Sequence, residues 1–155
     1  DYIINVLREI FAVSPARMLS LVVNKDDRQM SFNDILAAGS YEGLKDNMSL
    51  KIYRSLEKLK STPKLLDKFI KATGINVPND VKANALVYLE VRHLIIHNNS
   101  KADAKFNQMN NAGLVKVNPS NNKITINFAL ANSAITSVFI LCKTMEDELK
   151  RIGLV

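Results

Sequence analysis

Apolar side chains recur at helical spacing along most of the chain. Near the N-terminus, Ile3, Val6, Leu7, Ile10 and Phe11 repeat every three or four residues, which is typical of a helix with one buried face. The same period, read with its Ser, Pro and Gly boundary residues, predicts further helices over about 15–22, 32–38, 44–60, 63–73, 79–98 and 132–152. Helices therefore dominate the predicted structure.

Two short runs of β-like sequence, residues 113–117 and 123–127, interrupt this pattern before the last helix. Asn118, Pro119, Ser120, Asn121 and Asn122 lie between them and are strong turn residues, so the two runs predict a hairpin. The segment carrying Lys101, Asp103 and Lys105 is expected to be a loop. We expect an all-α protein, an antiparallel helical bundle with a small β-hairpin inserted near 113–127.

Length and composition narrow the class of protein. A chain of 155 residues with 47% hydrophobic residues predicts a single domain over residues 1–155 with a true core. Its first residues look like the inside of a helix and no Met precedes them, so a piece of a longer chain is one expectation. The single Cys142 excludes an internal disulfide and a Cys-based zinc finger. No uninterrupted apolar run reaches about 18 residues, so we expect no membrane span and a cytoplasmic location.

The net charge of +6 is concentrated after residue 40. Seven Lys or Arg residues fall between positions 51 and 71, against only Glu57 and Asp67. A basic helix face attracts polyanions, although the same run also suits an ordinary solvated face. The candidate RNA-binding residues that share helix stripes here are Lys51, Arg54, Lys58, Lys64, Lys68 and Lys71.

The segment from Tyr88 to Asn99 carries both histidines of the chain on an otherwise apolar helix. At about 100° per residue, Val87, Tyr88, Val91, Leu94 and Ile95 form one core-facing stripe. A second face combines polar groups with apolar neighbours: Leu86, Leu89, His93, Ile96 and His97, flanked by Arg92. An apolar face with a polar rim indicates a partner surface or a cleft. In a symmetric pair, two copies of this face would meet across the twofold axis.

An Arg beside a His suits phosphate chemistry. The guanidinium binds two phosphate oxygens at once, in a bidentate contact, and keeps its positive charge. An imidazole accepts and donates protons near neutral pH. Together they suit metal-free RNA cleavage, in which a base deprotonates the ribose 2′-OH and the cation stabilises the charge on the phosphoryl oxygens.

Other interpretations of these residues stay open. His93 and His97 can form a buried hydrogen-bonded pair, and Arg92 can pair with Glu90. The two histidines also have the spacing of metal ligands, but Leu94 stands where a zincin would carry its Glu, and a di-iron bundle would need a third His. Cys142 lies in an apolar segment and is better explained as a core residue. We therefore predict no metal and no cofactor.

At Arg92, His93, Leu94, Ile95, Ile96 and His97 the sequence resembles the HEPN superfamily, small all-α domains with an Arg-x4-His motif. The resemblance implies a metal-independent endoribonuclease that leaves 2′,3′-cyclic phosphate ends and works as a homodimer through the face of residues 86–97. Arg92 would position the scissile phosphate, His97 would be the general base or acid, and His93, with Glu90 more weakly, would support them.

Domains of that superfamily serve as toxins of toxin–antitoxin modules and in phage defence, so an antitoxin is one implied partner. Others are non-catalytic modules that bind a nucleotidyltransferase, a nucleotide or RNA, which is the alternative function. A helical regulatory domain of a larger protein is a third hypothesis.

Overall fold

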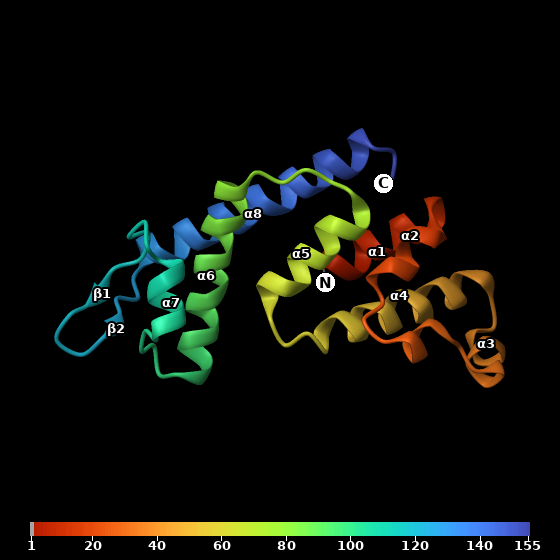
Figure 1. Cartoon of the computed structure of the whole chain (residues 1–155), viewed down its shortest axis with the longest axis horizontal. Coiled ribbons are helices and arrows are strands. Elements are labelled where there is room, and N and C mark those ends of the chain that lie inside the picture. Colours follow the sequence, from red (N-terminus) through yellow and green to blue (C-terminus); the bar gives the residue numbers. More distant parts are fainter. Residues whose placement is uncertain (1) are drawn as a thin grey trace. The chain divides into compact units, whose positions relative to one another are not determined.

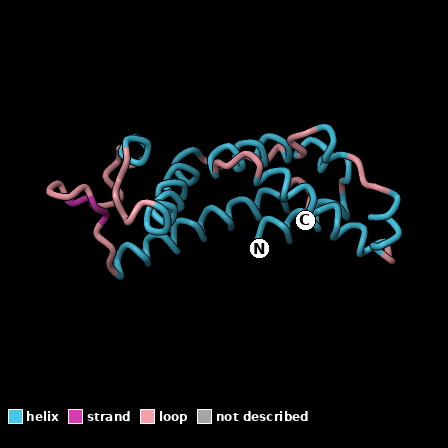
Figure 2. The backbone as a smooth tube through the Cα atoms, turned by 90° about the horizontal axis from the view of Figure 1, so that it is seen from below, coloured by secondary structure: helices cyan, strands magenta, loops and turns pink. Residues whose placement is uncertain are grey.

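The computed structural model describes residues 2–155, which form eight α-helices, one 3₁₀ helix and one pair of short strands. The elements in chain order (Figure 1) are α1 (Tyr2–Val13), α2 (Pro15–Leu21), η1 (Lys25–Arg28), α3 (Phe32–Ala38), α4 (Tyr41–Glu57), α5 (Thr62–Thr73), α6 (Asn79–His97), α7 (Ala104–Met109), β1 (Val117–Asn118), β2 (Lys123–Ile124) and α8 (Phe128–Arg151). The all-α class with a small antiparallel hairpin is confirmed, and Figure 2 shows how little strand the fold contains.

The chain divides into two compact units. Unit 1 consists of residues 1–76 and 146–155, and unit 2 of residues 77–145. The single domain over 1–155 stays a prediction, because it concerns whether the two units fold together.

In unit 1, α1 packs against α2 and α4, and α2 packs against α5. The buried side chains of α1 are those that the apolar period selects: Val6, Leu7, Ile10 and Phe11. Leu21, Leu56, Phe69 and Leu149 are also buried, so helix faces from distant parts of the sequence build this core.

The corner between α3 and α4 is set by local chemistry. Ser31 and Asp34 form a reciprocal capping box at the start of α3, and Gly39 ends the helix at φ +65°, a conformation that suits glycine. Ser40 then caps α4 through the backbone N–H of Gly43. A Cβ atom at Gly43 would lie 2.2 Å from the carbonyl oxygen of Ala38, so this tight corner requires glycine there.

Ser49 of α4 is completely buried, and its hydroxyl has no hydrogen-bond partner in the part of the chain that the structure describes. A buried unpaired hydroxyl costs stability, and Ala is the better helix former. We expect Ser49→Ala to raise the free energy of unfolding by about 1 kcal/mol in urea titrations. Ser55→Ala is the matched control: the Ser55 hydroxyl donates to Asp27 and accepts from the N–H of Val23, so this variant should lose about 1–2 kcal/mol. Equal effects of the two variants would contradict the prediction.

Glu148 ties the connector after α5 to the end of α8. Its Oε2 accepts the backbone N–H of Asn76 at 2.9 Å, and Arg151 donates Nε and Nη2 to the two carboxylate oxygens at 2.8 and 2.9 Å. Hydrogen bonds from Arg151 and then from Asn76 lower the pKa of Glu148 to about 2. This contact joins the two segments of unit 1.

The lowered pKa makes this contact dependent on pH. A carboxyl whose pKa is lower in the folded chain stabilises it above the unfolded pKa, and that contribution disappears as the pH falls to the folded value. We expect the stability advantage of wild type over Glu148→Gln to be constant above about pH 5 and to shrink from about pH 4.5 toward 2. Urea midpoints of both proteins across this range measure it, and parallel pH curves would refute it.

In unit 2, α6 supplies Val87, Tyr88, Val91 and Leu94 to the core. The other buried members of this cluster are Ala102, Phe106, Val115 and Ile124. The sequence mapping was right for the four residues of α6 but wrong for two others. Ile95 is 39% exposed, and Leu86 of the opposite face is buried, because the neighbours of α6 do not divide it into the two clean faces that the mapping assumed.

The hairpin is shorter than predicted. Val117 pairs with Ile124 and Asn118 with Lys123. The segment after α6 also bonds to the second strand: Ile124 N–H donates to the carbonyl of Ser100, and Ala102 N–H donates to the carbonyl of Asn122. The prediction of a loop around Lys105 was wrong. Asp103 caps α7 by accepting the N–H of Phe106 at 2.7 Å, and this helix is too short to give a periodic signal.

Helix α8 is long and apolar enough to cross a membrane by length and composition alone, with a mean hydropathy of 1.4 over its 18-residue window, of which 11% is buried. The sequence criterion missed it because Thr136 and Ser137 interrupt the apolar run, whereas a window average tolerates them. One such helix is weak evidence for a membrane, so the absence of membrane contact stays a prediction. The side chains of Phe128, Ile135 and Phe139 are exposed along one stripe of α8.

Candidate functional site

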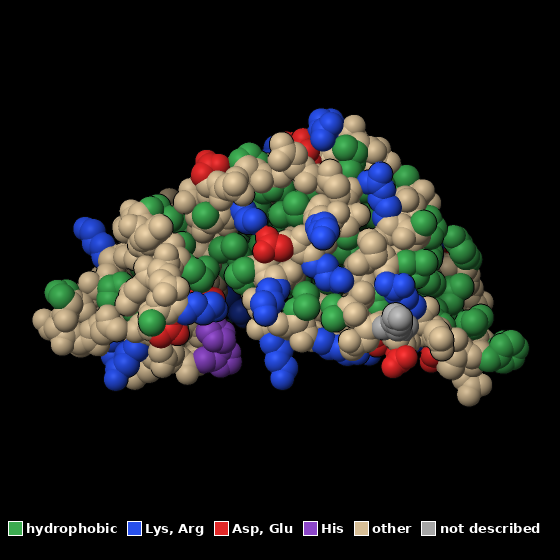
Figure 3. Space-filling model, viewed as in Figure 1, with side chains coloured by type: hydrophobic (Ala, Val, Ile, Leu, Met, Phe, Trp, Pro, Cys, Tyr) green, Lys and Arg blue, Asp and Glu red, His purple; other side chains and the backbone are tan. Residues whose placement is uncertain are grey.

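The side chains of Arg92, His93 and His97 are each exposed on the last turns of α6. The two imidazole rings are 4.8 Å apart between centroids and are tilted by 47°. In Figure 3 they form one purple patch on the surface of the molecule. The interpretation of a buried histidine pair was therefore wrong, and both rings are accessible to a ligand.

The inner face of α6 and its C-terminus position this group. Val91 and Leu94 are buried on the other side of the helix, so they fix its rotation about its own axis. At the end, the N–H groups of Asn98 and Ser100 both donate to the carbonyl of Leu94, and Ser100 takes a positive φ of 62°. His97 is thus the last residue of α6, and the chain leaves the helix directly after it.

Glu90 has a different role from the one that pairing with Arg92 would give it. Its carboxylate is buried and accepts from Lys105 Nζ of α7 at 2.8 Å. Arg92 makes no hydrogen bond or ion pair within the described residues, so its guanidinium is free to bind an anion. The supporting role predicted for Glu90 could therefore only be indirect: through Lys105 it holds α7 against the helix that carries the site. Sequence reasoning missed Lys105 as its partner because α7 was not expected.

The six basic residues proposed for RNA binding all belong to unit 1, whereas the Arg92–His97 group belongs to unit 2. Two of the six form hydrogen bonds with other residues of unit 1. Lys58 donates to both carboxylate oxygens of Asp27 at 2.8 and 2.9 Å, and Lys51 donates to the carbonyl of Gln29. These bonds lower their availability to phosphates.

The remaining four, Arg54, Lys64, Lys68 and Lys71, make no hydrogen bond or ion pair within residues 2–155. Lys68 and Lys71 line an open cavity of about 370 Å³ together with Ser20 and Ala72. The structure thus separates the basic run into engaged and free cations, a distinction that spacing alone does not make.

Metal and thiol chemistry have little geometric basis here. No three His, Cys, Asp or Glu side chains converge in the part of the chain that the structure describes, so His93 and His97 would need ligands from elsewhere. Burial raises the pKa of the Cys142 thiol, which lowers the fraction of reactive thiolate at neutral pH.

No family model, curated protein or solved structure matches this chain. The chemistry of this chain is therefore inferred from the residues of α6 and their geometry.

Proposed function

We propose that this chain is a metal-independent endoribonuclease of the HEPN type, with Arg92, His93 and His97 as its reaction centre. The observation that carries the proposal is that α6 exposes all three side chains, with the two imidazole rings 4.8 Å apart. The Arg-x4-His spacing that resembles the HEPN superfamily supports the same assignment.

In the proposed reaction, one imidazole accepts the proton of the ribose 2′-OH, and the 2′-oxygen forms a bond to the adjacent phosphorus. The bond from phosphorus to the 5′-oxygen of the next nucleotide breaks, and this oxygen takes a proton from an imidazolium. The products are a 2′,3′-cyclic phosphate and a free 5′-hydroxyl. Arg92 stabilises the charge on the phosphoryl oxygens, His97 transfers a proton, and His93 orients the phosphate or the partner imidazole.

A homodimer through the face of residues 86–97 is part of the proposal. Ile95 and Ile96 are 39% and 54% exposed beside the histidines, and apolar side chains next to a polar group favour a protein contact. Two copies would bring two Arg and four His side chains to one cleft. The proposed setting is the cytoplasm, in a toxin–antitoxin or phage-defence system with an antitoxin as partner.

A second function, a non-catalytic HEPN-type module, is favoured by a different observation. The exposed stripe of Phe128, Ile135 and Phe139 on α8 offers an apolar surface to a partner protein, such as a nucleotidyltransferase. In this function Arg92 and His97 would bind a nucleotide or RNA without cleaving it.

Incubation of the purified protein with a mixed-sequence RNA in excess EDTA tests the proposal. We expect cleavage products with 2′,3′-cyclic phosphate ends, identified by mass spectrometry of the fragments. Intact RNA under all conditions, with or without added Mg²⁺ or Mn²⁺, would contradict nuclease activity and favour the binding module. Cleavage that appears only with a divalent cation would contradict the metal-free mechanism.

A further inference from the structure

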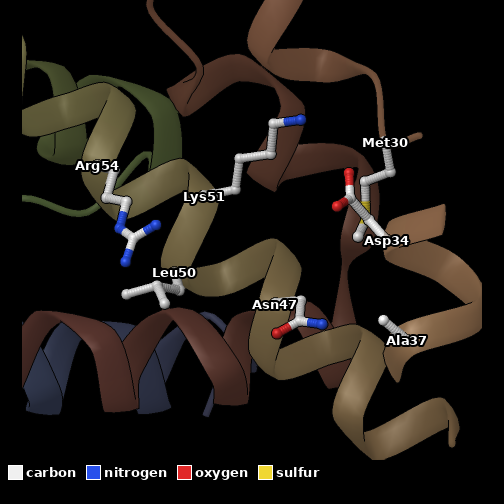
Figure 4. A pocket seen from close by; sticks show the side chains of 7 residues that line it. All are labelled: Met30, Asp34, Ala37, Asn47, Leu50, Lys51 and Arg54. Atoms are coloured by element: carbon white, nitrogen blue, oxygen red, sulfur yellow. The ribbon is translucent and has the colours of Figure 1, made fainter. Parts of the chain in front are cut away.

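A second potential binding site lies in unit 1, between α3 and α4. It is an open pocket of about 360 Å³ (Figure 4). The residues that line it are Met30, Asp34, Ala37, Asn47, Leu50, Lys51 and Arg54. The whole pocket is built by residues 30–54, so it depends only on the corner between two consecutive helices.

One face of α4 supplies four of the lining residues. Asn47, Leu50, Lys51 and Arg54 are spaced at i, i+3, i+4 and i+7, which places them on the same side of a helix. The side chains of Asn47 and Arg54 are exposed and make no hydrogen bond within the described residues. Lys51 is held by the carbonyl of Gln29. The pocket therefore presents one free guanidinium and one free amide.

The opposite side of the pocket adds a hydrogen-bond acceptor and apolar surface. Asp34 accepts the backbone N–H of Ser31 through Oδ2 at 3.1 Å and forms the capping box of α3 with this residue. Hydrogen bonding from Ser31 lowers the pKa of Asp34, so the group is an ionised acceptor at neutral pH. In Figure 4, Met30, Asp34 and Ala37 lie across from the side chains of α4.

The charges and shapes of these groups match one class of ligand. Lys51 and Arg54 contribute two positive charges and Asp34 one negative charge, which leaves one net positive charge in the pocket. Guanidinium groups bind phosphate oxygens in pairs. Apolar side chains and the planes of guanidinium groups receive unstacked bases, whose edges then find amide and carboxylate partners.

We propose that this pocket binds one nucleotide of a single-stranded RNA. Arg54 pairs with the phosphate, Leu50 and Met30 contact the base, and Asn47 and Asp34 receive the polar edge of the base. The choice of RNA rests on the proposed function, because the nucleotide would belong to the substrate. The site lies on unit 1 and is separate from the Arg92–His97 group, so it adds affinity rather than chemistry.

The test is binding of a fluorescently labelled, mixed-sequence RNA 12-mer, measured by anisotropy with the His97→Ala protein to prevent turnover. Arg54→Ala and Asn47→Ala should each raise Kd about tenfold. Arg28→Ala is the matched control, because it removes the same charge as Arg54→Ala. Arg28 is an exposed residue of the same unit and does not line this pocket. It should raise Kd no more than about twofold.

Asn47→Ala is the decisive variant because it changes no charge. A general electrostatic surface would respond to Arg54→Ala and Arg28→Ala alike and would ignore Asn47→Ala. That pattern, or no RNA binding at all, would overturn the proposal. A free mononucleotide that binds with the same dependence on Arg54 while the 12-mer does not bind would also overturn it.

This outcome is independent of the cleavage assay. If wild type does not cleave RNA but the 12-mer binds with the expected Arg54 and Asn47 dependence, the nuclease proposal fails and the pocket stands. If wild type cleaves and the two variants bind RNA as the His97→Ala parent does, the pocket fails and the nuclease proposal stands.

Discussion

We expect His97→Ala to lower the proposed RNA cleavage by about 10²–10⁴-fold, the usual contribution of a general acid or base, and Arg92→Ala to lower it by about 10²–10³-fold through lost charge stabilisation. Both side chains are exposed, so neither change removes packing, and the thermal unfolding midpoint should stay within about 1 °C of wild type. Single-turnover cleavage of a labelled RNA in EDTA measures the loss.

Two conservative variants separate chemistry from shape at this site. Arg92→Lys keeps the charge but loses the paired hydrogen bonds, so it should recover only part of the activity. His93→Asn keeps a polar side chain without proton exchange near neutral pH, and a lost limb in the pH profile of the cleavage rate would assign it a proton-transfer role. Full activity in both Arg92→Ala and His97→Ala would place the reaction centre elsewhere.

Phe106→Ala should lower the free energy of unfolding of unit 2 by about 3–5 kcal/mol. Phe106 is completely buried, and it is the one buried side chain of α7. Phe106 belongs to the same core cluster as Val91 and Leu94 of α6, so the cavity would weaken the packing of α7 against α6, to which the Lys105–Glu90 bond would still hold it. Urea titrations followed by circular dichroism give the change.

Phe128→Ala is the control for this result, since it removes the same atoms from a side chain that is 87% exposed. Its effect should stay within about 0.5 kcal/mol. If Phe128→Ala costs as much as Phe106→Ala, the exposed stripe of α8 is covered in solution, and the difference in burial on which the prediction depends is incorrect.

Helices with strong boundary residues were predictable from the sequence. Ser31 begins α3 and Gly39 ends it, and Gly74 ends α5. Capping by Ser and the left-handed backbone of Gly depend on neighbouring residues in the sequence and not on tertiary packing. Two helix starts were predicted too late: α4 begins at Tyr41 rather than Leu44, and α8 at Phe128 rather than Asn132. Both starts have a local cap that the apolar period does not reveal, because Ser40 accepts the N–H of Gly43 and Asn127 accepts the N–H of Leu130.

The candidate site was predictable in its residues and not in its surroundings. The spacing of Arg92, His93 and His97 along one predicted helix was enough to select them as candidates. Their exposure depends on which neighbours cover α6, and Glu90 finds Lys105 only because α7 folds back onto that helix. The pocket at Arg54 is a similar case, since its second wall comes from α3 and cannot be derived from the period of α4 alone.

Unit 2 is a continuous insertion, residues 77–145, between two segments of unit 1. The bond from Asn76 to Glu148 holds the two ends of that insertion close together. During synthesis from the N-terminus, the inserted unit is complete before the ribosome has made Leu149 and Leu154, which are buried in unit 1. Unit 1 is therefore completed only when residues 146–155 join the segment 1–76, after all of unit 2 has been made.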